Sequence, residues 1–271
     1  MIRAGAGIDT VSGGAGDDRL FGEGGADVLN GGAGEDRLLG EGGADVLNGG
    51  QGNDVMRGGP GDDTYRVGNA GDMVVELANE GRDRVRADID FTLPDHVEEL
   101  VMGALATVGT GNGLDNQIQG NGNSDTIDGR AGNDRLYGYD GDDTLIGRGG
   151  EDWLVGGAGL DTLVGGDDRD VFVFDDGDTG ATRNTADRIT QFEQSVDTIR
   201  LRPMDADTTV AGDQNFSFIG SAAFSGVAGQ LRYSHVNNFT YVEGDTNGDG
   251  TADFFIRING IHALITSDFT L

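Results

Sequence analysis

A single apolar position recurs every nine residues along the first quarter of the chain. From Ala4 to Arg66 the sequence divides into seven nonapeptides without a gap, and the eighth residue of each is apolar or aromatic. These residues are Val11, Leu20, Leu29, Leu38, Leu47, Met56 and Tyr65. The first six residues of each unit are rich in glycine and suit a tight turn. We expect the other three to form a very short strand whose alternation points only the eighth residue inward.

The same period returns in a second block, which spans Gly111 to Val173 and again contains seven units. In both blocks the sixth position is an aspartate, except in the first unit of the second block, where it is Asn116. The full unit reads G-G-x-G-x-D-x-U-x, with U an apolar residue, which is the pattern of a calcium-binding β-helix repeat. The aspartates are Asp9, Asp18, Asp27, Asp36, Asp45, Asp54, Asp63, Asp125, Asp134, Asp143, Asp152, Asp161 and Asp170.

A longer repeat of 18 residues overlies the nonapeptides, because residues 22–39 nearly duplicate residues 40–57. A unit with two distinguishable loops indicates that one full coil consists of two nonapeptides. The loops that start at Gly22 and Gly40 then stack on one side of the coil, and those that start at Gly13 and Gly31 stack on the other.

Composition adds a strong negative charge to this picture. The chain of 271 residues contains 51 Gly, no Cys and a formal net charge of −30. Such an excess repels nucleic acid and anionic membranes, and its self-repulsion opposes a compact state. No apolar run is long enough for a membrane span, and no N-terminal signal peptide is visible. We therefore expect a cation to be part of the folded form.

Stacked coils bring the repeat aspartates together. Coils about 4.8 Å apart place Asp18, Asp36 and Asp54 in one column. Two carboxylates about 5 Å apart repel each other by about 3 kcal/mol at an effective dielectric constant near 20. A hard cation that prefers six to eight oxygen ligands reverses this repulsion. Ca²⁺ suits such a site better than Mg²⁺, which demands a small octahedral site, or Zn²⁺, which prefers His or thiolate.

The predicted calcium ligands are the carboxylates of the repeat aspartates and the backbone carbonyls that the loop glycines leave unobstructed. The glycines assigned to this role are Gly14, Gly16, Gly32, Gly34, Gly50, Gly52, Gly157 and Gly159. If each loop pairs with the loop two units later, the first block holds five sites and the second holds four, which gives about nine calcium ions per chain.

The repeats resemble those of the RTX (repeats-in-toxin) proteins, which Gram-negative bacteria secrete by type I export. The stretches 63–67, 72–77, 81–85 and 97–101 resemble the spacer that links repeat blocks in many RTX proteins. The resemblance implies an all-β fold, in which a right-handed parallel β-roll with two nonapeptides per coil precedes a C-terminal β cap. It also implies a secreted, extracellular protein whose partners are calcium ions and the type I secretion machinery.

The last third of the chain differs from the repeats. Beyond Phe174 glycine becomes rarer and aromatic residues appear, which predicts a more conventional β core. The stretches 186–192, 226–233 and 244–254 are similar to the C-terminal domain of serralysin-type metalloproteases. The terminal residues Asp268 to Leu271, an acid followed by apolar residues, resemble the uncleaved export signals of type I substrates. A final strand that closes the β core is an alternative compatible with that role.

These observations divide the chain into four parts. The first repeat block covers residues 4–66, the spacer 67–110, the second block 111–173 and the cap 174–271. We expect the spacer to continue the roll with irregular loops; a small separate insertion is the alternative. Because the first repeat begins three residues after Met1 without a cap, we expect the chain to be the C-terminal part of a larger exoprotein.

One further loop carries candidate metal ligands. Asp245, Asn247, Asp249 and Asp253 stand at spacings 1, 3, 5 and 9, with Gly250 at position 6, as in the first half of an EF-hand loop. Position 12 is Ile256 instead of the bidentate glutamate. The alternative is a polar hairpin turn between two aromatic strands, and the sequence leaves both open.

The sequence is compatible with three classes of function. The first is a secreted module that folds on meeting extracellular Ca²⁺ and supports type I secretion. The second is an adhesin-like module that binds an extracellular polysaccharide or another surface. The third is an enzyme with an unrecognised site, but the chain has neither an H-E-x-x-H nor a G-x-S-x-G motif. We therefore expect no catalytic residues.

Overall fold

The computed structural model describes residues 1–202 and 204–271, and these residues form β-strands joined by loops. The helical structure in the described residues is a single 3-10 turn, η1 (Thr266–Asp268). None of the described residues belongs to a helix long and apolar enough to cross a membrane. The chain folds into two compact units, Met1–Gly120 and Asn121–Leu271.

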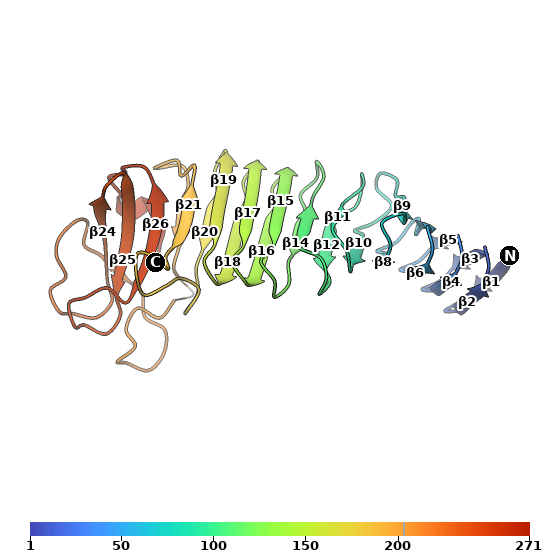
Figure 1. Cartoon of the computed structure of the whole chain (residues 1–271), viewed down its shortest axis with the longest axis horizontal. Helices are drawn as coiled ribbons and strands as arrows, with labels where there is room; N and C mark the ends of the chain where they lie inside the picture. The colour runs from blue at the N-terminus through green and yellow to red at the C-terminus, as the bar shows by residue number, and fades with distance from the viewer. Residues whose placement is uncertain (203) are drawn as a thin grey trace. The chain divides into compact units, whose positions relative to one another are not determined.

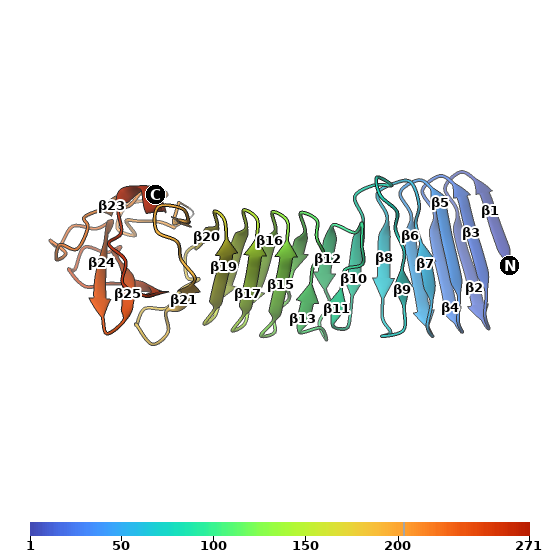
Figure 2. The ribbon, with the colours of Figure 1, turned by 90° about the horizontal axis from the view of Figure 1, so that it is seen from above.

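The first unit is a parallel β-roll whose repeat block is built from two sheets (Figure 1). The strands of one sheet, in spatial order, are β1 (Ile2–Ala6), β3 (Arg19–Gly24), β5 (Arg37–Gly42), β7 (Val55–Arg57) and β9 (Met73–Val74). The other sheet begins with β2 (Thr10–Ala15), β4 (Val28–Ala33), β6 (Val46–Gln51) and β8 (Thr64–Val67). Successive strands therefore alternate between the two sheets, and strands of one sheet lie side by side (Figure 2).

The register of these strands confirms that one coil contains two nonapeptides. Leu29 pairs with Leu47, and Leu20 pairs with Leu38, so partners are 18 residues apart. The apolar residue at the eighth position faces inward in every unit of the first block, and from Leu20 onward it is completely buried. The predicted apolar spine is therefore the core of the roll.

The strands are longer than the sequence indicates. The sequence predicts three residues per strand, but β2 to β6 each contain six. The pairing continues through the first three residues of the next nonapeptide, as in Gly14 with Gly32 and Ala15 with Ala33. Glycine has a low intrinsic propensity for β-strands, but here the neighbouring coil supplies the hydrogen bonds of these segments.

The spacer residues of the first unit also form parallel strands. β10 (Arg84–Ala87) pairs with β8 and with β12 (Glu99–Met102), and β12 pairs with β14 (Gln117–Gln119). On the opposite side, β11 (Phe91–Thr92) pairs with β13 (Val108–Thr110). The inward residues Val85, Leu100 and Ile118 are buried, as the eighth residues of the nonapeptides are.

The second unit begins with a similar roll. One sheet contains β15 (Thr126–Ala131), β17 (Thr144–Gly149) and β19 (Thr162–Asp167), and the other contains β16 (Arg135–Asp140), β18 (Trp153–Ala158) and β20 (Val171–Val173). Register partners are again 18 residues apart, as in Leu145 with Leu163 and Leu136 with Leu154.

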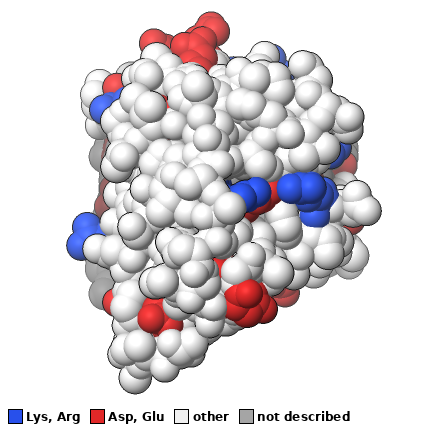
Figure 3. All heavy atoms as spheres, turned by 90° about the vertical axis from the view of Figure 1, so that its left-hand side faces the viewer, with Lys and Arg blue, Asp and Glu red and all other residues white. Residues whose placement is uncertain are grey.

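The second unit ends in a cap where the pairing changes. The strands are β21 (Asp187–Thr190), β22 (Thr198–Arg200), β23 (Ser217–Phe218), β24 (Gln230–Val236), β25 (Phe239–Asp245), β26 (Phe254–Asn259) and β27 (Phe269–Thr270). β21 pairs in parallel with β19 and β26, whereas β24, β25 and β26 are antiparallel. Ring contacts such as Phe216 with Phe254 fill its core. The exposed end of the cap carries few charged side chains (Figure 3).

Candidate metal centre

The repeat aspartates of the first unit form two hydrogen-bonded columns. The backbone N–H of each repeat aspartate from Asp9 to Asp54 donates to the Oδ1 atom of the aspartate 18 residues later, as from Asp18 to Asp36 at 2.7 Å and from Asp36 to Asp54 at 2.8 Å. The other column begins with Asp9 and Asp27, where the same bond is 2.8 Å long. The geometry places Asp18, Asp36 and Asp54 in one column, as the sequence predicts.

The second unit repeats the arrangement. In one column the backbone N–H of Asp125 donates to Asp143 Oδ1 at 2.7 Å, and the backbone N–H of Asp143 donates to Asp161 Oδ1 at 2.8 Å. Asp134 donates to Asp152 at 2.8 Å in the other, and that column continues to Asp170 at 3.0 Å. All six repeat aspartates of this block are buried.

Each column leaves carboxylate oxygens without a partner. In the aspartates that follow the first of a column, one oxygen accepts the N–H bond just described, whereas the Oδ2 atom of most of them is buried and accepts no hydrogen bond within the described residues. The aspartates for which this holds include Asp27, Asp36, Asp45, Asp54, Asp63, Asp143, Asp161 and Asp170. Buried carboxylate oxygens are costly unless a hydrogen bond or a cation compensates them. These atoms therefore mark positions where a cation fits.

The first glycine of each nonapeptide leaves room beside the carboxylate. A Cβ atom on Gly22 would lie 2.5 Å from Asp27 Oδ2 and 2.7 Å from the carbonyl oxygen of Gly40 in the next coil. A Cβ atom on Gly13 would lie 2.8 Å from Asp18 Oδ2 and 2.7 Å from the Gly31 carbonyl oxygen. Carboxylate and carbonyl oxygens thus border one small space, which is the donor set that Ca²⁺ prefers.

The second and fourth positions of the loops have positive φ angles. Gly14 has φ of 96° and Gly16 has φ of 99°. A Cβ atom on Gly34 would lie 2.6 Å from the Gly16 carbonyl oxygen, and one on Gly32 would clash with the Gly14 carbonyl. The predicted glycine carbonyls therefore point along the stack into the space between coils. The other predicted glycines, Gly50, Gly52, Gly157 and Gly159, also have positive φ.

The second position tolerates other residues more readily than the repeat pattern indicates. Glu23, Glu41, Arg130, Tyr139 and Arg148 occupy it with φ angles between 71° and 80°. These angles belong to the left-handed helical region, which non-glycine residues visit at a modest cost. The fourth position is stricter, because there φ exceeds 110° in most loops, where side chains rarely fit.

Burial strongly perturbs the aspartates in the absence of a cation. Desolvation raises the pKa of Asp63 and Asp170 to about 8, from a usual value of 3.8. The backbone hydrogen bond to each carboxylate lowers the pKa by less, and the neighbouring aspartate raises it further. Desolvation likewise raises the pKa of Asp161 to about 7 and that of Asp143 to about 6. These four aspartates are therefore poor sites for charge until a cation binds.

Four further aspartates extend the columns beyond the repeats, and sequence reasoning missed them. Asp54 donates to Asp72 at 3.1 Å and Asp63 to Asp83 at 2.8 Å. Asp161 and Asp170 donate in the same way to Asp187 at 2.9 Å and Asp197 at 3.0 Å. Each stands two residues before a buried apolar residue, as the repeat aspartates do. That D-x-U signal is present in the sequence, but three of the four lie at spacings of 20, 26 and 27 residues instead of 18.

The loop from Asp245 to Asp253 connects the antiparallel strands β25 and β26. Asp245 is buried, and its two carboxylate oxygens accept hydrogen bonds from the N–H groups of Gly248 and Gly250. Both oxygens of Asp253 accept bonds from Thr246 or Asn247, and Asp249 accepts two from Thr251. The hydrogen bonds of a polar hairpin thus account for the loop, and a metal site here stays a prediction.

Family comparisons agree with these repeats. Residues 101–271 match the family described as Peptidase M10 serralysin C terminal, which is more than half of the chain. Residues 3–38, 30–65 and 39–74 match the RTX calcium-binding nonapeptide repeat (4 copies). A comparison with curated protein sequences gave no match.

Among solved structures, similar chains include two subunits of the Azotobacter vinelandii mannuronan C5-epimerase. AlgE6R3 is 26% identical over 58% of this chain and 78% of its own, with a TM-score of 0.29. AlgE6R2 is 22% identical over 61% and 91%, with a TM-score of 0.36. The extracellular lipase LipA from Serratia marcescens is 16% identical over 93% of this chain and 40% of its own, with a TM-score of 0.39.

RTX nonapeptide repeats bind Ca²⁺, and proteins with these repeats and with serralysin C-terminal domains are secreted. The protein belongs to the serralysin C-terminal family and carries a calcium-binding RTX repeat module.

Proposed function

We propose that this chain is a module that stays unfolded until it meets extracellular Ca²⁺ and then folds around the bound ions. The observation that carries the proposal is the set of buried Oδ2 atoms without partners in the aspartate columns. Four of these carboxylates lie beside a loop glycine and a carbonyl oxygen of the next coil, so oxygen ligands are already grouped there: Asp27, Asp36, Asp45 and Asp143. No catalytic role is part of the proposal.

About nine ions follow from pairing each repeat aspartate with the one 18 residues later. In this arrangement the first block supplies five sites and the second block four. The ligands are the carboxylates of both aspartates and the carbonyls of the second and fourth loop residues. The hydrogen bonds between successive aspartates and the direction of the glycine carbonyls support this pairing.

One substitution in each column tests the pairing. Asp36→Asn is expected to weaken two calcium sites, because Asp36 lies between Asp18 and Asp54. Asp9→Asn is expected to weaken only one, because Asp9 begins its column. Calcium titration by calorimetry measures the number of strong sites in each variant.

Asp17→Asn is the matched control, because Asp17 is the exposed residue next to Asp18 and its carboxylate accepts a hydrogen bond from the Glu35 N–H, outside the columns. It removes one negative charge without touching a column, so its calcium count should equal that of the unchanged protein. Equal losses in Asp36→Asn and Asp9→Asn would contradict the stacked pairing.

A role in type I export is the second part of the proposal, and the C-terminus has a structural role as well. Asp268 is buried, and its carboxylate accepts hydrogen bonds from the N–H groups of Ser195 and Ile265 at 3.1 and 2.8 Å. β27 pairs with β22, and the ring of Phe269 lies 4.9 Å from that of Phe218. Because a C-terminal signal is synthesised last, export can begin only after the whole chain has been made. The low concentration of Ca²⁺ in the cytosol keeps that chain unfolded and able to pass through an exporter.

Deletion of residues 268–271 is expected to abolish secretion from a host with a matching type I exporter. Phe218→Ala is the control, because it removes the same Phe218–Phe269 contact and leaves the terminal sequence intact. The amount of chain in the culture medium is measured under denaturing conditions, so that folding after export does not affect the result. Normal secretion of the deleted chain would mean that these residues are only a structural strand.

Polysaccharide binding stays an expectation from the sequence. A surface cleft of about 460 Å³ in the cap is lined by Arg183 and Arg232 and by the rings of Phe224 and Phe255. Both arginines, however, form ion pairs of 2.7 Å with the buried carboxylate of Glu243. Burial alone would raise the pKa of Glu243, but hydrogen bonds from Ser234 and the two arginines lower it below its usual value. The arginines of this cleft are thus already occupied, and the calcium module is the function we propose.

A further inference from the structure

Glu76 occupies a position that is glycine in the nonapeptides. β9 pairs with β7 so that Val55 lies opposite Met73 and Met56 opposite Val74. Continued by two residues, this register places Glu76 opposite Gly58, the first glycine of the last nonapeptide in the block. The spacer therefore carries a carboxylate where six of the seven preceding loops carry only a hydrogen atom and the first carries the methyl group of Ala4.

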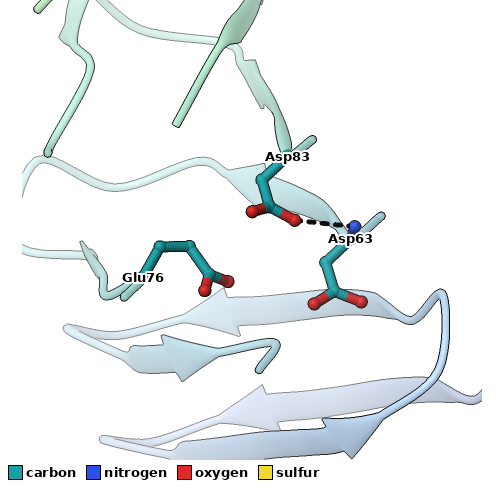
Figure 4. A group of neighbouring side chains, drawn as sticks. All are labelled: Asp63, Glu76 and Asp83. Carbon is teal, nitrogen blue, oxygen red and sulfur yellow. Dashed lines mark hydrogen bonds between the residues drawn. The ribbon is translucent and has the colours of Figure 1, made fainter. Parts of the chain in front are cut away.

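A side chain at this position of the loop points toward the aspartate carboxylate. A Cβ atom on Gly58 would clash with the Asp63 carboxylate and lie 2.5 Å from the Tyr65 hydroxyl. The loop that contains Glu76 has room for a side chain, because Asp63 and Asp83 are 20 residues apart instead of 18. Figure 4 shows the Glu76 carboxylate facing those of Asp63 and Asp83.

Three carboxylates meet in this loop. Asp63, Glu76 and Asp83 each offer an oxygen within 4.8 Å of the other two. Asp63 and Asp83 are each 1% exposed and Glu76 is 5% exposed. Asp63 Oδ2 and Glu76 Oε2 are buried and accept no hydrogen bond within the described residues. The Tyr65 hydroxyl donates to Glu76 Oε1 and accepts a 2.5 Å bond from the Gly58 N–H, which holds the glutamate in place.

The arginines of this region do not neutralise the three acids. Arg57 pairs with Glu80 at 3.3 Å, and Arg82 and Arg84 both pair with Glu99 at 2.8 and 2.5 Å. A buried group of three carboxylates with orphaned oxygens is therefore left for a cation. Oxygen ligands in an irregular loop favour Ca²⁺ over Mg²⁺, which demands near-ideal octahedral geometry.

We propose that Asp63, Glu76 and Asp83 bind a calcium ion that closes the first repeat block, with Glu76 as the ligand that distinguishes it from the sites between nonapeptides. The inference rests on the proposed calcium columns and adds a site with a ligand outside the repeats. It gives the block one ion more than the pairing of repeat aspartates alone.

Calcium titration of Glu76→Gln tests the site in the full chain. The variant is expected to bind one ion fewer than the unchanged protein, with the same far-ultraviolet circular dichroism at saturating Ca²⁺. Glu80→Gln is the matched control. Glu80 lies four residues after Glu76 and pairs with Arg57 instead of the cluster, so this variant removes one negative charge without removing a proposed ligand. Its calcium count should not change.

Glu76→Asp keeps the charge and shortens the side chain by one methylene. It is expected to retain the ion with an affinity at least tenfold lower, and it remains informative if Glu76→Gln does not fold. Unchanged count and affinity in either Glu76 variant would overturn the inference. If instead Asp36→Asn loses no ion, the failure lies in the proposed calcium columns.

Discussion

Removal of Ca²⁺ is expected to convert the β-roll into a largely disordered chain. The buried spine contributes about one apolar side chain per nine residues, each worth roughly 1.5–3 kcal/mol. Folding must also order the backbone of these nine residues, and one apolar side chain per unit does not offset that loss of conformational entropy. Each calcium site that exists only in the folded state adds about 2.7 kcal/mol at a hundredfold excess over Kd. With about nine such sites, calcium decides whether the chain folds.

Far-ultraviolet circular dichroism with millimolar Ca²⁺ and with EGTA measures this change. The controls are Mg²⁺ and NaCl at matched ionic strength, which screen the net charge of −30 without supplying a large oxygen-liganded cation. Neither should restore the β spectrum after chelation. A β spectrum that survives EGTA unchanged would show that apolar burial and backbone hydrogen bonds suffice.

The sequence predicts the roll well because its geometry constrains the same positions in every coil. Leu38 must face inward and Asp36 must face the neighbouring loop, so both recur with the period of the coil. The spacing of 18 residues between Leu29 and Leu47 is visible in the sequence as a near-duplication of residues 22–39. The period alone is therefore enough to assign the repeat aspartates to two columns of candidate ligands.

The ends of the columns could not be assigned in this way. Insertions before Asp83, Asp187 and Asp197 break the period, although the backbone still returns to the same hydrogen bond. The role of Glu76 cannot be predicted from the sequence for a related reason. Its position opposite Gly58 follows only from the pairing of β9 with β7. Tertiary pairing, and not local sequence, determines these positions.

The strand lengths and the pairing in the cap are also not evident from the sequence. Glycines such as Gly32 weaken strand propensity, but in the roll they pair with Gly14 and Gly50 in adjacent coils. In the cap, aromatic residues predict a β core but not its pairing. The antiparallel register of Tyr233 with Val242 depends on contacts between segments that the sequence alone does not order.

Acidification is expected to favour the calcium-free fold, which is the opposite of its effect on calcium binding. Burial raises the pKa of Asp63, Asp170 and Asp187 to about 8 in the folded chain without a cation, from a usual value of 3.8. The folded state therefore holds these protons more tightly than the unfolded state does. Their stabilising effect is complete below about pH 4 and is lost as the pH rises to about 8.

In calcium-free buffer, the β signal is therefore expected to be strongest near pH 4 and to disappear progressively towards pH 8. With saturating Ca²⁺ the chain should be folded at pH 8, because the cation replaces the protons, and calcium affinity should fall as the pH falls. Circular dichroism at several pH values, with light scattering to detect aggregation near the isoelectric point of about 4.1, distinguishes the two regimes. A calcium-free β signal that grows with rising pH would mean that the buried carboxylates are not protonated in the folded chain. Such a result would separate the stability of the roll from the charge state of its aspartate columns.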